Sequence, residues 1–259
     1  YGAKCVLGSA TPSMESYFNA QSGKYGLVTL TERYGGVSLP QVLISDTLRS
    51  ARRGEKRSHF NKLLLDRIDE AMVQGQQVML FQNRRGFSPF VECGQCGWTA
   101  TCPDCNVTLT YHKSDHSLRC HYCGYHTSLP ACCPSCGADD LQPRGFGTEK
   151  IEEALADIFP HAVIDRLDAD TSRSPQSYRR IISAFERGDT DILIGTQMIT
   201  KGFDFDRVAL VGILNADNLL NYPDFRAGER AFQLMMQVGG RAGRRSEQGV
   251  VVIQTSQPG

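Results

Sequence analysis

The sequence lacks the features of a membrane-spanning, secreted or strongly charged protein. Among 259 residues, 28 are Lys or Arg and 28 are Asp or Glu, so a zero net charge gives no overall attraction to nucleic acid. No apolar run reaches bilayer-spanning length, and no signal peptide is present. A hydrophobic content of 41% supports a real core. These features predict a soluble, intracellular chain of one large domain or two small ones.

A second absence concerns phosphate binding. The sequence holds no G-x-x-x-x-G-K-[ST] loop to cradle phosphates, and no apolar strand that ends in a Walker B acid for Mg²⁺. Asp69 and Glu70 fall on the polar face of an amphipathic helical pattern, which excludes them from that role. The chain begins without methionine and ends just after a strand-like run. We therefore expect a fragment of a longer protein.

What the sequence does have is cysteine, concentrated between residues 93 and 136. Four C-x-x-C pairs supply eight thiols, and Gly or Asn follows each pair, as a backbone that folds around a metal at positive φ requires. Four thiolates close a structural zinc site, so eight predict two Zn²⁺ ions. The pairs are Cys93 and Cys96, Cys102 and Cys105, Cys120 and Cys123, and Cys133 and Cys136, followed by Gly97, Asn106, Gly124 and Gly137.

Other readings of these cysteines fit less well. Disulfides need an oxidising compartment, a redox site needs only one pair, and iron–sulfur clusters use other spacings. The fourteen residues between the second and third pairs match a zinc-ribbon spacing. This favours a nested arrangement, in which the inner two pairs share one ion and the outer two share the other, with a cross-brace as the alternative. Cys132 is out of register, and Cys5 is predicted to be a buried apolar residue.

Outside this block, strand-like and helix-like patterns alternate. Strands are predicted at 27–30, 42–44, 78–81, 162–167, 191–195, 208–215 and 250–255, and another ends near Leu7. Helices are predicted after an N-cap at Ser13 and at 60–73, 148–158 (N-cap Thr148), 176–187 and 226–238, with a polar, basic loop from Arg49 to Arg57. The alternation indicates an α/β domain with a mostly parallel sheet, interrupted by the cysteine block before helix 148–158. Ligands bind such sheets at the carboxyl ends of strands.

Two loops carry residues suited to phosphate chemistry. Gln237 to Arg244 places Arg241 and Arg244 three residues apart among glycines, which suits guanidinium groups that reach a polyphosphate; the alternative is a basic cap on a helix C-terminus. Gly195 to Asp204 offers hydroxyls, Lys201 and a carboxylate, which hold phosphates and ribose; the alternative is an ordinary loop. Ser9-Ala10-Thr11 is too short to carry a prediction by itself.

Together these segments resemble the motifs of superfamily 2 helicases in order and spacing. Ser9–Pro12 resembles motif III, Asn83–Gly86 a motif IV region, Gly195–Asp204 motif V and Gln237–Arg244 motif VI. With eight cysteines inserted in the second RecA-like lobe, the chain looks like a member of the PriA (primosomal protein N′) family of bacterial replication-restart helicases. The resemblance implies a P-loop-NTPase-type helicase lobe interrupted by a two-zinc, ribbon-like module. The implied divisions are 1–40 (end of lobe 1 and linker), 41–91 (first part of lobe 2), 92–145 (zinc-binding insertion) and 146–259 (remainder of lobe 2).

The resemblance also assigns roles. Arg244 is implied as the arginine finger on the ATP γ-phosphate, with Arg241 beside it and Gln237 ordering the loop. Lys201, Gly202 and Asp204 are implied to contact nucleotide, and Ser9, Ala10 and Thr11 to couple hydrolysis to lobe movement. Nucleic-acid contacts fall on Arg84, Arg85, Thr196 and Thr200. The zinc ligands would be Cys93, Cys96, Cys133 and Cys136 in site 1, and Cys102, Cys105, Cys120 and Cys123 in site 2.

The implied activity is ATP-dependent 3′→5′ DNA unwinding at stalled or branched forks, followed by primosome assembly for replication restart. Cofactors would be two structural Zn²⁺, and ATP with Mg²⁺. Partners would be single-stranded and branched DNA, primosome proteins and single-stranded-DNA-binding protein, in the bacterial cytoplasm at the nucleoid and without a membrane. Both Walker motifs are expected upstream, so this fragment alone is expected to be inactive as an ATPase. Rival hypotheses are a zinc-ribbon scaffold that recruits proteins, and another superfamily 2 motor that acts on RNA.

Overall fold

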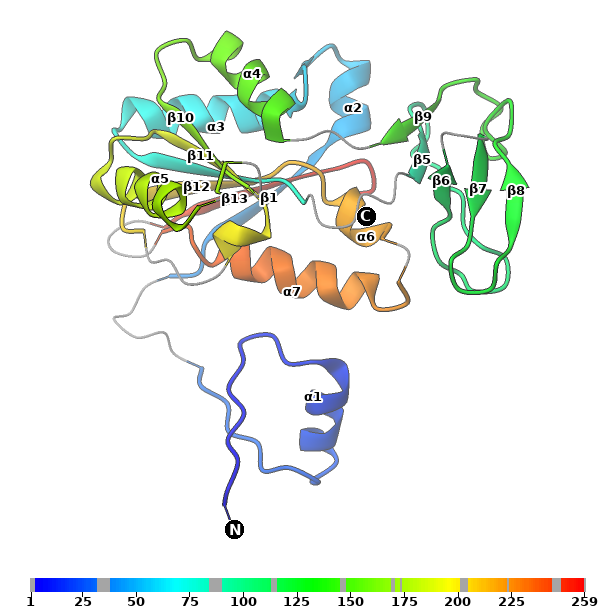
Figure 1. Cartoon of the computed structure of the whole chain (residues 1–259), viewed down its shortest axis with the longest axis horizontal. Coiled ribbons are helices and arrows are strands. Elements are labelled where there is room, and N and C mark those ends of the chain that lie inside the picture. Colours follow the sequence, from blue (N-terminus) through cyan, green and yellow to red (C-terminus); the bar gives the residue numbers. More distant parts are fainter. Residues whose placement is uncertain are drawn as a thin grey trace.

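A six-stranded, fully parallel sheet forms the centre of the computed structural model, which describes residues 3–31, 38–83, 90–112, 116–144, 148–168, 171–172, 174–200, 205–222, 224–243 and 248–258. The strand order is β1-β13-β12-β4-β11-β10 (Figure 1). The strands are β1 (Gln41–Asp46), β4 (Gln77–Phe81), β10 (Ile164–Leu167), β11 (Ile192–Gly195), β12 (Val208–Ile213) and β13 (Val250–Thr255). The predicted α/β class with a parallel sheet is confirmed.

Helices cover both faces of this sheet. α3 (Lys62–Val73) and α4 (Thr148–Ile158) lie on one face, and α5 (Pro175–Arg187) and α7 (Ala227–Gly239) lie on the other (Figure 1). Along β4, Val78 and Leu80 join the core under α3 and α4, whereas Met79 and Phe81 join the opposite core. Because both faces are buried, the strands read as continuous apolar runs rather than alternating ones.

Short elements complete this lobe at the sheet edges. They are α2 (Thr47–Arg52), β2 (Lys56–Arg57), β3 (Phe60–Asn61), the 3₁₀ helix η2 (Gln197–Thr200) and α6 (Asp217–Leu220). α5 shows how local sequence sets an end: Ser174 forms a capping box with Ser177, and Gly188 ends the helix at a φ of 86°. η2 lies where an irregular loop was predicted between β11 and β12.

The cysteine-rich module is inserted between β4 and α4. β5 (Phe90–Cys93) pairs antiparallel with β9 (Leu141–Arg144) at its base, and β6 (Thr110–His112), β7 (Ser117–Arg119) and β8 (His126–Ser128) form a three-stranded antiparallel sheet. Its own small core includes Val91, Leu109 and Leu118. Figure 1 shows the module beside the sheet, next to α6. It therefore folds as an appendage with few apolar contacts to the lobe.

The N-terminal segment lies apart from the sheet in Figure 1. Its helix α1 (Met14–Gln21) starts at the predicted N-cap, where the Ser13 hydroxyl accepts a hydrogen bond from the Ser16 N–H at 3.2 Å. α1 buries no residue. Its segment touches α7 through polar groups: Gln233 Nε2 donates to the Thr11 carbonyl, and the Met14 N–H donates to Glu229 Oε1, both at 3.3 Å.

Five predictions about local structure are wrong. The segments at 27–30 and before Gly8 form no strand, because no neighbouring strand supplies hydrogen bonds to them. Arg49 to Arg57 is mostly α2 and β2, since the Asp46 carboxylate accepts from the N–H groups of Leu48 and Arg49 at 2.9 Å and starts a helix. Thr148 is the first residue of α4 rather than its cap. Cys5 is exposed.

None of the described helices combines the length and the apolarity needed to cross a bilayer.

Candidate functional site

Eight thiols gather into two groups of four within the module. Cys93, Cys96, Cys133 and Cys136 form one group, and Cys102, Cys105, Cys120 and Cys123 form the other, with all sulfurs of a group within 4.8 Å of one another. This is the nested grouping, not the cross-brace. Cys132, although described, joins neither group.

The spacing of the sulfurs fits a tetrahedral ion. Cys93 to Cys136, Cys96 to Cys133, and Cys102 to Cys123 are each 3.6 Å apart, sulfur to sulfur. A zinc ion with sulfur ligands at about 2.3 Å requires sulfur–sulfur edges of roughly 3.8 Å, so each group is close to the size that the ion needs. An all-sulfur, four-ligand set is typical of a structural zinc site with no open position for substrate.

Each pair ends in the turn that the sequence predicted. The residues at these turns have φ values of 75° (Gly97), 52° (Asn106), 79° (Gly124) and 76° (Gly137). Their N–H groups donate to the carbonyl of the first cysteine of each pair at 2.8–3.1 Å. Only Gly adopts this conformation freely and Asn tolerates it, which explains the residue that follows every pair.

One thiol in each group is prepared for ionisation. Burial raises the pKa of Cys120, but the backbone N–H groups of Cys123 and Tyr122 outweigh burial and lower the pKa to about 7. Cys133 is in the same situation, since N–H groups of Cys136 and Ser135 lower its pKa to about 7 against the effect of burial. In the same groups, a hydrogen bond with Cys123 raises the pKa of Cys105 to about 12. The Ala138 N–H lowers the pKa of Cys136, but contacts with the sulfurs of Cys96 and Cys93 outweigh it and raise the pKa to about 12. Because the thiolate is the metal ligand, the thiols of each group lose their protons over a wide range of pH when zinc binds.

A side-chain hydrogen bond joins the segments that resemble motifs V and VI. Arg241, just beyond the end of α7, donates from Nη2 to the carbonyl of Thr200 at 2.7 Å. Gln237 is exposed on the last turn of α7. Six predicted site residues lie outside the described part of the chain: Arg84, Arg85, Lys201, Gly202, Asp204 and Arg244.

A cavity of about 680 Å³ separates η2 from α6 and α7. Its walls combine predicted residues, Thr200 and Gln237, with Asn83 at the end of β4. Gln197 also lines it, and its Nε2 lies 3.4 Å from Asn83 Oδ1. The cavity therefore lies between the residues that follow β4 and β11 and one side of α7. Sequence reasoning missed the other polar residues of its wall, Tyr222, Arg230 and Gln233, because only the packing of α7 brings them there.

The two threonines predicted to contact DNA are buried. Thr196 is 6% exposed and Thr200 is 2% exposed. The Thr200 hydroxyl donates to the Gln197 carbonyl at 2.8 Å, so it is already used inside η2. Their direct contact with DNA stays a prediction that this geometry does not favour. Ser9 and Ala10 are exposed and Thr11 is partly exposed, and of these three predicted coupling residues Thr11 contacts α7 through its carbonyl.

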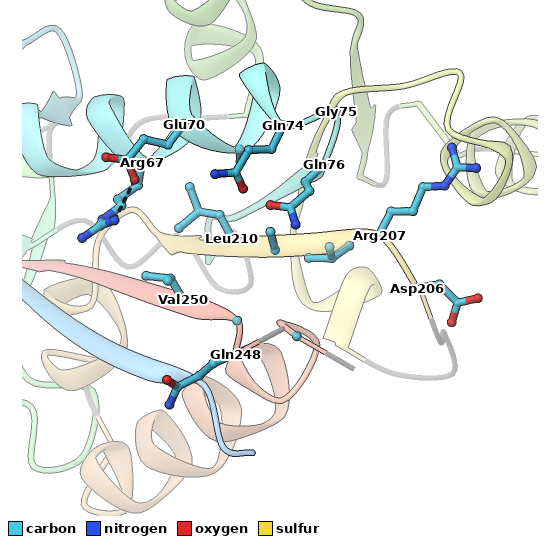
Figure 2. A pocket seen from close by; sticks show the side chains of 15 residues that line it. Arg67, Glu70, Gln74, Gly75, Gln76, Asp206, Arg207, Leu210, Gln248 and Val250 are labelled. Carbon is cyan, nitrogen blue, oxygen red and sulfur yellow. Dashed lines mark hydrogen bonds and ion pairs between the residues drawn. The ribbon is translucent and has the colours of Figure 1, made fainter. Parts of the chain in front are cut away.

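A second cavity, of about 390 Å³, lies at the amino ends of β12 and β13. Figure 2 shows Arg67 and Glu70 paired on α3 at one end of it and Asp206 and Arg207 at the other. Gly243 and Gln248, which flank residues 244–247, also line it. Residues just after the motif V segment and Gly243 of the motif VI segment therefore line one cavity.

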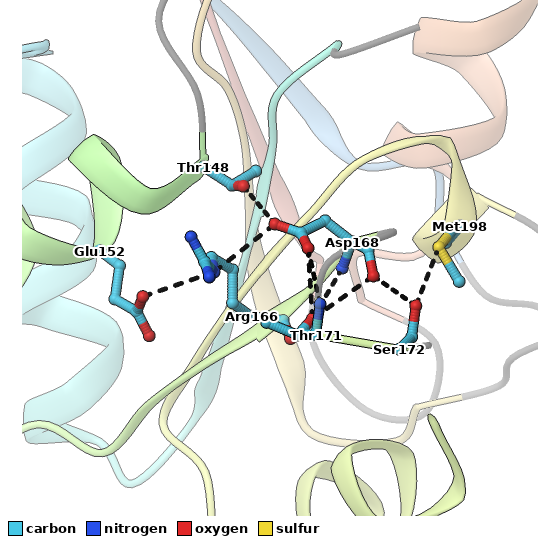
Figure 3. A network of polar contacts seen from close by, with 7 residues as sticks. All are labelled: Thr148, Glu152, Arg166, Asp168, Thr171, Ser172 and Met198. Atoms are coloured by element: carbon cyan, nitrogen blue, oxygen red, sulfur yellow. Dashed lines mark hydrogen bonds and ion pairs between the residues drawn. The ribbon is translucent and has the colours of Figure 1, made fainter. Parts of the chain in front are cut away.

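A buried polar network ties α4 to β10 and η2 (Figure 3). Asp168, with no exposed surface, accepts a hydrogen bond from the Thr148 hydroxyl and lies 3.5 Å from Arg166 Nε. Its other oxygen accepts from the Thr171 N–H at 3.0 Å, and Ser172 reaches the Met198 sulfur in η2. The sequence analysis missed this network, because an Asp that follows a strand also fits an ordinary turn.

Comparison with known proteins agrees with this geometry. The model of the "PriA DNA helicase Cys-rich region (CRR) domain" matches residues 102–127, and that of the "Helicase conserved C-terminal domain" matches residues 147–246. "Replication restart protein PriA" of Bacillus subtilis is 45% identical over 253 residues, which are 98% of this chain and 31% of that protein. The Haemophilus influenzae protein of the same name is 42% identical over 253 residues (98% and 34%), and that of Chlamydia muridarum is 46% identical over 259 residues (99% and 34%).

Similarity to solved structures is weaker. RecG bound to a three-way DNA junction is 15% identical and covers 95% of this chain and 22% of that one, with a TM-score of 0.46.

The parallel sheet, the two cysteine groups and the matched domain models define a helicase C-terminal domain that carries a cysteine-rich zinc ribbon. The chain belongs to the PriA family, and it spans about a third of the length of the curated relatives it matches.

Proposed function

We propose that this chain is the end of lobe 1 and the whole of lobe 2 of an ATP-dependent 3′→5′ DNA helicase that restarts replication at stalled or branched forks. The single observation that carries the proposal is the hydrogen bond from Arg241 to the Thr200 carbonyl, 2.7 Å long. It fixes the end of α7, which leads into Arg244, against η2, which leads into Lys201 and Asp204. A nucleotide held by an upstream lobe would meet both segments together.

In this proposal, different residues serve ATP hydrolysis, nucleotide binding and lobe movement. Arg244 is the arginine finger that stabilises charge in the transition state, and Arg241 and Gln237 position its loop. Lys201, Gly202 and Asp204 contact the nucleotide, and Mg²⁺ is held by the upstream lobe. Ser9, Ala10 and Thr11 pass the lobe movement to α7, which the contact between Thr11 and Gln233 supports.

The proposed nucleic-acid path crosses the carboxyl ends of β4 and β11. Asn83 and Gln197 line the larger cavity there, and Arg84 and Arg85 follow Asn83 directly. The zinc-stabilised module stands at the same side of the lobe as α6 and would extend the surface for branched DNA, primosome proteins and single-stranded-DNA-binding protein (Figure 1). We propose that the helicase acts at the bacterial nucleoid.

Unwinding by the full-length protein tests the proposal. We expect Arg244→Ala to lower the ATPase rate by on the order of 10³–10⁵ and to abolish strand separation of forked DNA. Arg180→Ala, at an exposed position of α5, is the matched control and should keep wild-type rates. Full ATPase activity in the Arg244 variant would show that the finger is assigned wrongly.

Two alternatives remain open to the same assays. A scaffold that recruits proteins through its zinc ribbon would bind its partners equally well with and without Arg244. A motor acting on RNA would be stimulated more by duplex RNA than by forked DNA. The match to the PriA cysteine-rich region supports the DNA helicase over both.

A further inference from the structure

The two zinc sites differ in how they contact the lobe. A methyl group at Gly97, the turn residue of the first cysteine pair, would lie 3.3 Å from Leu48 Cδ1 on α2 and 3.6 Å from the Ser256 carbonyl after β13. A methyl group at Gly124 in site 2, or at Gly137 in the second pair of site 1, would meet none of the described atoms within 4 Å. The turn at Gly97 is therefore packed against the lobe, whereas the other two face open space.

Hydrogen bonds strengthen this contact. Arg52 of α2 donates from Nη2 to the Gln95 carbonyl, and Gln257 Nε2 donates to the Gly97 carbonyl at 3.3 Å. Both acceptors are backbone carbonyls inside the turn between Cys93 and Gly97. Together with the packing of Gly97, these two bonds form what we call the docking contact.

The acceptors depend on the metal site. The turn reaches its shape because Gly97 has a φ of 75° and because its N–H donates to the Cys93 carbonyl at 2.9 Å. Folding of such turns is coupled to metal binding, because the ion is what holds the four sulfurs together and the site is not preformed in the unfolded chain. Loss of zinc from site 1 would therefore remove the carbonyl positions that Arg52 and Gln257 recognise, even though neither side chain touches the metal.

On the lobe side, the docking contact rests on a buried carboxylate. Asp217, the first residue of α6, is 5% exposed and accepts hydrogen bonds from the Ser256 N–H at 2.8 Å and from the Thr255 hydroxyl. Gln257, which donates to the Gly97 carbonyl, follows Ser256 directly in the chain. The end of β13 thus joins the Gly97 turn to the start of α6, which leads to α7.

We infer that site 1 is a metal-dependent docking surface that attaches the module to α2 and β13, whereas site 2 belongs to the core of the module, where most of its cysteines pack with Val91 and Leu141, and stabilises the module itself. The inference goes beyond the helicase proposal and does not depend on it. It assigns Arg52 and Gln257 a role in recognising the zinc-folded turn, and it makes the order of α6 depend on zinc in site 1.

Three variants of the full-length protein test this inference by hydrogen exchange and zinc content. Cys96→Ser with Cys136→Ser removes site 1, and Cys105→Ser with Cys123→Ser removes site 2. Arg52→Ala with Gln257→Ala breaks the docking contact and leaves every cysteine in place. Native mass spectrometry should count one zinc in each cysteine variant and two in the docking variant.

The expected pattern is asymmetric. The site 1 variant and the docking variant should both exchange the amides of Ser256 and α6 about tenfold faster, as the loss of one or two hydrogen bonds predicts. The site 2 variant should speed exchange at residues 100–128 and leave those lobe amides unchanged. Equal effects of the two cysteine variants on the lobe would overturn the inference. Wild-type exchange rates of Ser256 and α6 in the docking variant would also overturn the inference. Because this variant keeps both zinc sites, that result can be interpreted without any change in metal content.

Discussion

Arg241 Nη2 lies 2.7 Å from the carbonyl oxygen of Thr200, so one guanidinium group holds together two loops that are 41 residues apart in sequence. Arginine suits this place, because its planar fork can bond a carbonyl and still present other N–H groups to a phosphate. The contact links the segment that follows α7 directly to the end of η2.

Removal of this guanidinium should weaken both the lobe and its catalysis. We expect Arg241→Ala to lower the free energy of unfolding by about 1.5 kcal/mol, the value of a hydrogen bond from a charged donor, and to lower kcat of the full-length ATPase. Arg241→Lys keeps the charge without the fork and should recover stability more than activity. Urea unfolding and steady-state ATPase assays measure the two effects, and Arg180→Ala is the control. An unchanged kcat in Arg241→Ala would refute the positioning role.

The buried network at Asp168 should matter more for stability than an exposed ion pair. Asp168→Ala leaves the buried Thr148 hydroxyl without its partner and Arg166 with only Glu152, at 3.4 Å, and we expect a loss of roughly 3 kcal/mol, the lower end of the cost of breaking a buried pair. Asp189→Ala breaks the exposed pair with Arg187 and should cost at most about 1 kcal/mol. Urea denaturation of both variants gives the comparison. Equal losses of unfolding free energy in the two variants would show that burial adds nothing to the contribution of the Asp168 network.

Zinc uptake should depend on pH in a defined direction. Cys120 and Cys133 have pKa values lowered from 9.0 to about 7, so their thiolates persist above pH 7 and are protonated below it. Cys105 and Cys136, with pKa values raised to about 12, must also lose a proton to bind zinc, so the affinity of metal-free protein for zinc should fall with decreasing pH both above and below about 7, and more steeply below it. Competition with a chromophoric chelator between pH 6 and about 8.5 measures this. A flat affinity across that range would contradict the pKa shifts.

The 259-residue chain by itself should not hydrolyse ATP. It holds no phosphate-binding loop and no Walker B acid, so an arginine finger would have no bound nucleotide to act on. A phosphate-release assay with forked DNA as stimulant should give the background rate. The same assay on the full-length protein is the control that the forked DNA stimulates ATP hydrolysis. Robust turnover by the 259-residue chain would refute the prediction.

The sequence predicted most of the sheet because β4, β11, β12 and β13 are buried on both faces and therefore read as apolar runs. It failed at residues 27–30, where an apolar run has no neighbouring strand, and at α2, where a single Asp46 side chain starts a helix in a basic stretch. Local composition cannot report whether a hydrogen-bonding partner will arrive from a distant part of the chain.

By itself, the sequence determined the two zinc sites, because two-residue spacing and a Gly or Asn after each pair are local requirements of a turn around a metal. The tertiary structure alone decided which loops meet: Arg241 with Thr200, Asp168 with Thr148, and the Gly97 turn with Gln257. These contacts depend on the order of strands in the sheet and on the path of the chain back from the module. No pattern of neighbouring residues encodes that order, since it is set by the packing of the whole lobe.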